Sequence, residues 1–250
     1  MLKGICMKKW TTKSGIEVIR LVSGMSNVFA VRKENRFLLV DTGRKMNCRK
    51  LLQRIDWMET GGCKLAALIF THAHYDHTSN AKDVLTGHDV PVIINKRDAV
   101  YLESGRSAPI KGTVSVTRFL VNKLEKQLMP FVEYPSVKSD IQVDLQMNLE
   151  EVGFKEVQLL YTPGHTLGSQ SVIVENEIAL VGDAMFGCFP GSIFPPFAQD
   201  TGLLTESWSR MIDTGCTVFL PSHGTGNTRE LVEKECRNHK GIDRKEIQES

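Results

Sequence analysis

The stretch THAHYDH, residues 71–77, concentrates three histidines and one aspartate within seven positions. It directly follows LAALIF, residues 65–70, a continuous apolar run that predicts a strand buried on both faces. Open α/β sheets tend to bind their ligands at the carboxyl ends of such strands. The sequence therefore predicts a ligand site immediately after this strand.

The spacing within this stretch is that of metal ligands. His72 and His74 lie two positions apart on an extended segment, so they project to the same side and can share one ion. Asp76 and His77 follow on a turn, where the chain can direct them to a second ion about 3.5–4 Å away. A zinc site requires imidazole nitrogens or carboxylate oxygens that converge at about 2 Å, and a catalytic site leaves one position for water.

Three further candidate ligands come at the ends of other predicted strands. They are His165 in TPGHT, Asp183 in VGD and His223 in PSHG. Five of the seven histidines thus fall in corresponding loops, which predicts that THAHYDH holds metal. His88 and His239 lie outside the pattern, and we expect ordinary surface or helix-end roles for them.

Length and composition indicate an ordinary soluble domain. The 250 residues are 41% hydrophobic and 24% charged, and they predict a single domain over 1–250 with a less regular helical insertion near 105–140. Neither a signal-peptide core nor a run of about 18 apolar residues occurs, which argues against secretion and membrane spanning. Six cysteines without CxxC spacing favour reduced thiols in a cytoplasmic protein.

Charge is unevenly distributed along the chain. The formal net charge is only +2, yet residues 1–50 contain twelve Lys and Arg against three Asp and Glu. Such a segment can attract an anionic substrate or a nucleic acid. Because the basic residues alternate with apolar strand patterns, a solvated surface is the better interpretation. We expect a small-molecule substrate and no nucleic-acid or membrane partner, whereas the oligomeric state is open.

Apolar periodicity alternates between strand-like and helix-like stretches, which predicts an α/β fold. The expected strands are residues 16–22, 27–31, 36–43, 65–70, 90–94, 156–165, 170–176, 177–183 and 217–224. The first three are short and consecutive, which implies antiparallel pairing. The expected helices are residues 45–60, 79–85, 97–104, 203–213 and 227–238. Inside the insertion, Leu120, Val121, Leu124 and Leu128 share one helical face that Pro130 ends.

These motifs together resemble the metallo-β-lactamase-fold hydrolase superfamily. The resemblance rests on HxHxDH, TPGHTLGS, GDAMF and LPSHG with the upstream LLVDTG, and it covers residues from about 25 to 225. It implies a four-layer αβ/βα sandwich with metals between the two sheets at one edge. It also implies that Asp41, in VDTG, orients the metal-binding loop.

By the same resemblance, seven side chains bind two metal ions. The first ion would be held by His72, His74 and His165. The second would be held by Asp76, His77 and His223. Asp183 would bridge both ions.

Ligand identity separates the branches of the superfamily. One group of zinc β-lactamases has cysteine where Asp183 stands and another lacks the bridging carboxylate, so antibiotic hydrolysis is disfavoured. Flavin-associated di-iron reductases have glutamate in place of His74, so that branch is disfavoured as well. Glyoxalase II-type thioester hydrolases and acyl-homoserine-lactone lactonases share all seven ligands, and this branch is therefore expected. The tRNA 3′-processing ribonuclease shares them too, but its exosite arm and His-Ser-Thr motif are not found.

The expected function is hydrolysis of a small acyl substrate, a thioester, ester or lactone, by a hydroxide that bridges two divalent ions. Zinc is expected, with iron or manganese as alternatives, and Asp76 is the candidate catalytic residue for proton transfer. The alternatives are a phosphodiesterase or nuclease on this fold, and a mononuclear iron oxygenase resembling persulfide dioxygenases. The phenylalanine-rich residues 184–200 either wall the site or only pack the loop, and Cys188 is expected to be inert.

Overall fold

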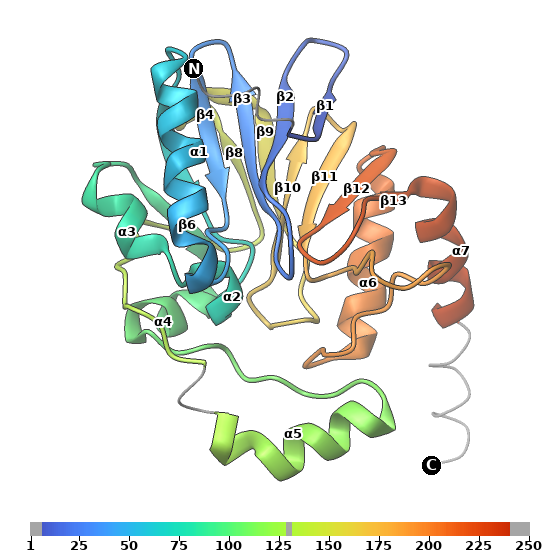
Figure 1. The fold of residues 1–250 in the computed structure, drawn as a ribbon. Coiled ribbons are helices and arrows are strands. Elements are labelled where there is room, and N and C mark those ends of the chain that lie inside the picture. Colours follow the sequence, from blue (N-terminus) through green and yellow to red (C-terminus); the bar gives the residue numbers. More distant parts are fainter. Residues whose placement is uncertain (1–6, 129–131, 241–250) are drawn as a thin grey trace.

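Two mixed β-sheets form the centre of the molecule (Figure 1). The computed structural model describes residues 7–128 and 132–240. The first sheet contains, in spatial order, β1 (Lys9–Thr11), β2 (Glu17–Val22), β3 (Val28–Lys33), β4 (Arg36–Val40), β5 (Lys64–Ile69), β6 (Val92–Asn95) and β7 (Ile141–Val143). The second contains β13 (Asn227–Thr228), β12 (Val218–Pro221), β11 (Ile178–Gly182), β10 (Gln170–Val174), β9 (Phe154–Tyr161) and β8 (Gln146–Leu149).

Strand direction changes within each sheet. β2, β3 and β4 pair antiparallel, as expected, and β1 also pairs antiparallel with β2, while β4 to β7 are parallel. In the second sheet β11 and β12 are parallel and the other neighbours antiparallel. Parallel neighbours bring their carboxyl ends to the same edge of a sheet. The loops after β5 and after β11 begin at such carboxyl ends, where ligands commonly bind.

Helices cover the outer faces of both sheets (Figure 1). On the side of the first sheet are α1 (Cys48–Thr60), entered through the 3₁₀ turn Lys45–Asn47, α3 (Ala81–Thr86) and α4 (Lys96–Ser104). On the side of the second are α6 (Thr201–Asp213) and α7 (Arg229–Lys240). The short α2 (Tyr75–Thr78) follows β5, and a 3₁₀ turn, Glu150–Val152, precedes β9.

Three hydrophobic clusters fill the spaces between four layers. Successive strand residues point to opposite faces, so Leu39 packs with α1 while Leu38 packs between the two sheets. On the second sheet, Val172 belongs to the central cluster and Ile173 to the cluster that contains Trp208 of α6. Helix, sheet, sheet and helix thus stack in order, and the expected αβ/βα sandwich is confirmed.

Every predicted strand and helix has a counterpart, and the differences are at ends and edges. Strands expected to run through 43, 165 and 224 stop at Val40, Tyr161 and Pro221, because the residues beyond them form the loops of the site. The edge strands β1, β7, β8 and β13 were not predicted, since two to four residues are too few to display a period of two.

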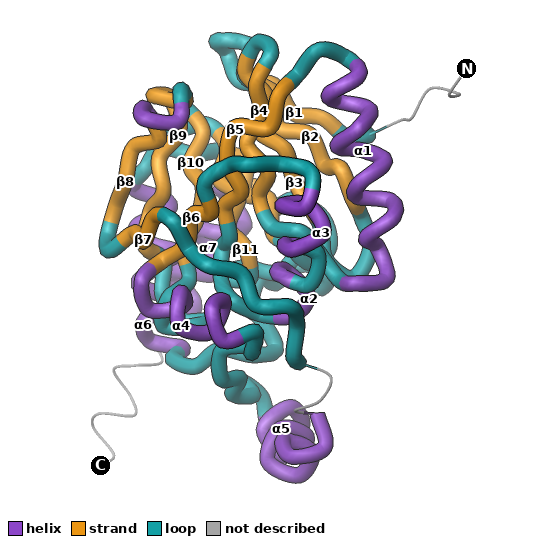
Figure 2. Tube along the Cα trace, turned by 90° about the vertical axis from the view of Figure 1, so that its left-hand side faces the viewer, coloured by secondary structure: helices purple, strands orange, loops and turns teal. Residues whose placement is uncertain are grey.

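The insertion near 105–140 contains α5 (Ser115–Leu128), which lies apart from the sandwich (Figure 2). This helix begins at Ser115, ahead of the residues whose pattern predicted it, and Val116 and Phe119 on it are exposed. Pro130, expected to end the helix, lies outside the described residues. The assignment of residues 1–250 to one domain remains a prediction.

No helix among the described residues combines the length and apolar character that crossing a bilayer requires. The five cysteines within those residues, Cys48, Cys63, Cys188, Cys216 and Cys236, are free thiols.

Candidate metal centre

The loop that follows β5 turns sharply because α2 is a single helical turn. The His74 carbonyl accepts hydrogen bonds from the His77 N–H at 2.9 Å and from the Thr78 hydroxyl at 2.8 Å. His74 itself is extended, with φ −110° and ψ 152°. His72 and His74 therefore belong to extended chain, whereas Asp76 and His77 belong to the turn and face another direction.

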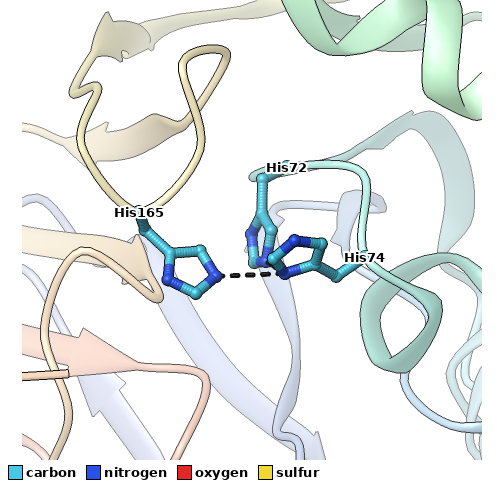
Figure 3. Close-up of side chains that lie close together, drawn as sticks. All are labelled: His72, His74 and His165. Carbon is cyan, nitrogen blue, oxygen red and sulfur yellow. Dashed lines mark hydrogen bonds between the residues drawn. The ribbon is translucent and has the colours of Figure 1, made fainter. Parts of the chain in front are cut away.

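Three histidine rings converge at one point in Figure 3. His74 Nδ1 lies 3.1 Å from His72 Nε2 and 3.1 Å from His165 Nε2. All three side chains are buried. Nitrogens bound to one tetrahedral zinc at about 2.0–2.1 Å lie roughly 3.3 Å apart. The three-histidine group, His72, His74 and His165, has the spacing of a metal site.

The protonation of these rings follows from their other nitrogens. His74 Nε2 faces the Ala108 carbonyl at 3.1 Å and His165 Nδ1 faces the Phe197 carbonyl at 2.9 Å. A carbonyl oxygen only accepts, so both of these nitrogens carry a hydrogen. The nitrogens that face each other, His74 Nδ1 and His165 Nε2, then both present lone pairs in the neutral rings. Two acceptors in contact repel unless a cation lies between them.

The same reasoning applies to His72. The Thr71 hydroxyl donates to the Asp41 carboxylate at 2.9 Å, so toward His72 Nδ1, 3.1 Å away, it accepts. His72 Nδ1 therefore carries the hydrogen and Nε2 points a lone pair at the centre of the group. Histidines that bind metals typically donate their other N–H to a protein oxygen in this way.

A second cluster lies beside the first and contains carboxylates. Asp76, His77 and His223, called the mixed group below, bring ligand atoms within 4.8 Å of one another. His223 Nε2 lies 3.4 Å from Asp76 Oδ2, while His77 Nε2 lies 3.8 Å from Asp76 Oδ1. Asp76 and His223 keep 16% and 15% of their side chains exposed, so this group borders solvent.

Asp183 lies between the two groups. Its carboxylate oxygens are 3.5 Å from His165 Nε2, 3.4 Å from His77 Nε2 and 3.1 Å from His223 Nε2. The preceding Gly182 has φ 54°, and a Cβ there would come within 2.7 Å of the Thr71 side chain. Glycine therefore lets β11 end close to the loop of β5 and places Asp183 at the centre.

Electrostatics differ between the groups. Burial, together with the neighbouring histidines, lowers the pKa of His72 and His74 well below the ordinary value, and burial also lowers the pKa of His165. Burial acts in the same direction on His77 and His223. There the charge of Asp183 and other carboxylates outweighs it and raises the pKa of both, that of His77 well above its usual range.

Burial would also raise the pKa of Asp183, but His223, His77 and His165 hold it well below the ordinary value. Asp183 therefore stays ionised among the rings. Two buried ligand atoms, His77 Nε2 and Asp183 Oδ1, have no hydrogen-bond partner in the protein. Such atoms are rare in native structures and are explained when they face an ion or water.

Asp41 supports both groups from behind. It adopts φ 60°, a strained conformation for a residue other than glycine. Its carboxylate accepts from the Thr71 N–H at 2.8 Å and from His77 Nδ1 at 2.8 Å. Asp41 thereby orients one histidine directly and a second through Thr71, which is the role that the resemblance implied for it.

Sequence reasoning missed Asp98, on the first turn of α4. Its buried carboxylate accepts from the Ala73 N–H at 2.8 Å and from the Thr166 hydroxyl at 2.9 Å, and Gly168 N–H is a further donor. Burial raises the pKa of Asp98 to about 6 despite these hydrogen bonds. Asp98 joins the loop of His72 and His74 to the loop of His165, and an acidic residue at a helix start gives no sign of this in the sequence.

A cavity of about 290 Å³ opens onto the centre and is lined by ligands of both groups and by Asp183. Phe186 and Phe197 line it as well, and Phe186 stacks on His223 with ring centroids 4.5 Å apart. Phe194 instead packs on Trp208, and Phe189 is exposed. Residues 184–200 therefore line the site with some phenylalanines and pack another against Trp208.

Residues expected to be outside the centre are outside it. Cys188 is exposed and belongs to none of the ligand groups found in the described residues; burial of its sulfur and the nearby Asp183 raise its thiol pKa. His88 pairs with the Val84 carbonyl and Glu59 at the end of α3. His239 packs against Phe194.

Comparison with known proteins gives a consistent picture. Residues 22–223 match the family described as the Metallo-beta-lactamase superfamily. The chain is 28% identical over 235 residues to the probable metallo-hydrolase YflN of Bacillus subtilis, covering 84% of this chain and 86% of that protein. It is 28% identical over 152 residues to a probable metallo-hydrolase of Methanocaldococcus jannaschii, covering 60% and 62%.

Among solved structures, an archaeal metallo-beta-lactamase superfamily protein from Sulfolobus tokodaii superposes with a TM-score of 0.56 at 19% identity. The superposition covers 86% of this chain and 80% of that one, and it shows a shared fold. The family match extends over most of the chain and includes each of the seven candidate ligands and Asp41. The chain therefore belongs to the metallo-beta-lactamase superfamily.

Proposed function

We propose that the chain is a metallo-hydrolase that binds two divalent ions and hydrolyses a small acyl substrate, a thioester, ester or lactone. The three-histidine group would hold one ion and the mixed group the other, with Asp183 shared between them. Imidazole nitrogens with carboxylate oxygens are ligands that suit zinc. Iron and manganese bind the same donors and remain alternatives.

The observation that carries the proposal is the convergence of lone pairs. His72, His74 and His165 each direct an unprotonated nitrogen to one point while the opposite nitrogen faces a protein oxygen. A purely structural histidine cluster would instead pair donors with acceptors. His77 Nε2 and Asp183 Oδ1 lie 3.4 Å apart without a hydrogen bond, which leaves both atoms available to a cation.

Two divalent ions held here would lower the pKa of a shared water toward neutrality and supply hydroxide near pH 7. Hydrolysis breaks the bond between the acyl carbon and its leaving atom, forms a carbon–oxygen bond to the water oxygen, and delivers a proton to the leaving group. Asp76 lines the cavity and is partly exposed, so its carboxylate can pass that proton on. Phe186 and Phe197 line the same cavity and reduce its contact with bulk water.

The nuclease alternative has less support. Lys9 and Arg32 pair with Glu17, and Lys33 pairs with Glu156, so part of the basic N-terminal segment is neutralised locally. None of the described Lys or Arg residues lines the cavity, so a phosphodiester would have the proposed ions and no Lys or Arg side chain as cationic contacts there. The oxygenase alternative differs in metal number, which the following experiment decides.

The test combines metal analysis with a substrate panel. The purified protein should bind close to two divalent ions per chain and hydrolyse at least one class among thioesters, esters and lactones faster than phosphodiesters. Binding of a single iron with oxygen consumption, or cleavage of phosphodiesters alone, would contradict the proposal.

A further inference from the structure

Four apolar residues line the cavity together with the ligands. They are Ile110, Val132, Phe186 and Phe197, and they come from three separate segments of the chain. Apart from the ligands themselves, the described residues that line the cavity carry no charged group. A group that enters beside the metal centre thus meets an uncharged wall.

The wall is held in place by backbone hydrogen bonds. Residues 107–113, called the crossing segment here, carry Ile110 between the loop of β5 and the phenylalanine-rich loop. Ala108 N–H donates to the Ala73 carbonyl at 2.8 Å on one side, and Ala198 N–H donates to the Lys111 carbonyl at 2.9 Å on the other. The Ser107 hydroxyl donates to the Val132 carbonyl at 2.8 Å. The wall is preorganised, which reduces the entropic cost of binding against it.

Arg44, which packs on the cavity residue Tyr75, is engaged with other side chains. Arg44 lies over the Tyr75 ring, 5.6 Å from its centroid, and directs a guanidinium nitrogen to Met25 Sδ. An anionic substituent inside the cavity would therefore be desolvated without a partner from the wall, and burying an unpaired charge is costly.

The volume limits the size of the group. The cavity has a volume of about 290 Å³. This is near the lower end of small-molecule sites, about 300–1,000 Å³. A short or medium acyl chain with its reacting carbonyl fits this volume.

We infer that Ile110, Val132, Phe186 and Phe197 form an acyl pocket that selects uncharged, apolar acyl groups and rejects acyl groups with a terminal carboxylate. This inference rests on the proposed acyl hydrolysis and narrows its substrate class to neutral esters, thioesters or lactones. Selectivity arises because no side chain of the acyl pocket can pair with a carboxylate at the far end of the acyl group, whereas the proposed ions act at the carbonyl end in both kinds of substrate.

The experiment compares p-nitrophenyl hexanoate with the p-nitrophenyl monoester of adipate, which has the same chain length and a terminal carboxylate. We expect kcat/KM to favour the hexanoate by about 100-fold or more. Binding of the corresponding anilides to the metal-loaded protein, measured by calorimetry, should show the same preference without any turnover.

The informative variant is Ile110→Lys, which places a cation in the wall at a partly exposed position. It should reduce the preference for hexanoate by about tenfold or more. The matched control Ile110→Met has similar length without charge and should keep the preference. Metal content and circular dichroism confirm that both variants fold.

The outcomes are separable. If the wild-type protein cleaves both esters equally and binds both anilides equally, the acyl pocket is refuted while acyl hydrolysis stands. If the neutral anilide binds selectively but no acyl substrate is cleaved, the pocket stands and the proposed function fails. An Ile110→Lys protein with an unchanged preference would also refute the pocket.

Discussion

The two halves of the metal centre use charge differently. The three-histidine group is buried, and its histidine pKa values are lowered, so its rings offer neutral lone pairs. The mixed group borders solvent, contains Asp76, and raises the pKa of His77 and His223 through nearby carboxylates. We therefore expect protons to compete little with a cation at the three-histidine group and more strongly at the mixed group. From this contrast we expect the two proposed ions to be bound with unequal strength.

The largest expected effect comes from removing both ions. Chelation should reduce hydrolysis to the uncatalysed rate, because it removes the ions that supply the attacking hydroxide. Among the described residues that line the cavity, Ser107 is the only serine or cysteine that could replace it as a nucleophile. Measurement of metal content during stepwise chelation should show the mixed group emptying before the three-histidine group. Loss of both ions in a single step would contradict the expected difference in metal affinity between the two groups.

Asp183→Asn should have the next largest effect. The amide keeps the size of Asp183 but removes the charge that offsets repulsion between two cations. Because groups that merely hydrogen-bond a metal ligand typically affect activity by about 10–100-fold, we expect a loss of about 100-fold or more for Asp183→Asn. Metal analysis should find one ion retained, and excess metal should restore part of the activity.

The exposed Asp213→Asn is the matched control for Asp183→Asn and should behave as wild type. Full occupancy and full activity of Asp183→Asn would mean that Asp183 does not bridge the ions, and the assignment to the thioesterase and lactonase branch would fail with it.

Acidification should have a smaller effect and should lower the metal occupancy of the two groups at different pH values. Protons compete with metal at His77 and His223 once the pH falls below their raised pKa values, and affinity should drop about tenfold per pH unit for each proton displaced. At His72, His74 and His165 the lowered pKa values postpone this competition to more acidic pH. Metal occupancy measured from about pH 8 to about pH 5 should therefore fall first to one ion per chain. Simultaneous release would contradict the assignment.

Asp98→Asn should give the smallest of these effects, and it should weaken the three-histidine group instead of the mixed group. Asparagine keeps one acceptor oxygen, but its amide nitrogen cannot accept, so at least one of the hydrogen bonds that Ala73, Thr166 and Gly168 donate is lost and the loops of the three-histidine group should loosen. We expect the affinity for its ion to fall about tenfold, with a smaller change at the mixed group. Competition with a chromophoric chelator measures both. Asp140→Asn, on the loop before β7, would serve as a control for general destabilisation.

Local spacing explains why much of the centre could be predicted. His72 and His74 reveal their shared direction because a period of two is a property of extended chain alone. His165, Asp183 and His223 could be found because each comes at the end of a recognisable strand and within a family motif. Their convergence was an expectation from the resemblance, and the geometry brings their ligand atoms together.

Other features had no local signature. Asp98 resembles any acidic residue in a first helical turn, and only the packing of α4 against two loops gives it three donors. The edge strands β7 and β8 have mixed polarity and few residues, so their pairing depends on neighbours far along the chain. The crossing segment lacks periodicity altogether, and its hydrogen bonds to Ala73 and Ala198 define it.

The sequence by itself determined the alternation of strands and helices and the candidate ligands, because hydrophobic periodicity and short ligand spacings are encoded locally. The resemblance of its motifs implied the family and, through it, the αβ/βα sandwich. Tertiary structure alone decided which imidazole nitrogen faces the centre, since this depends on the Ala108 and Phe197 carbonyls and on Asp41. It also decided that Ile110 and Phe186 share one wall. Protonation, pKa and pocket shape result from burial and from contacts between residues distant in sequence, which no local pattern records.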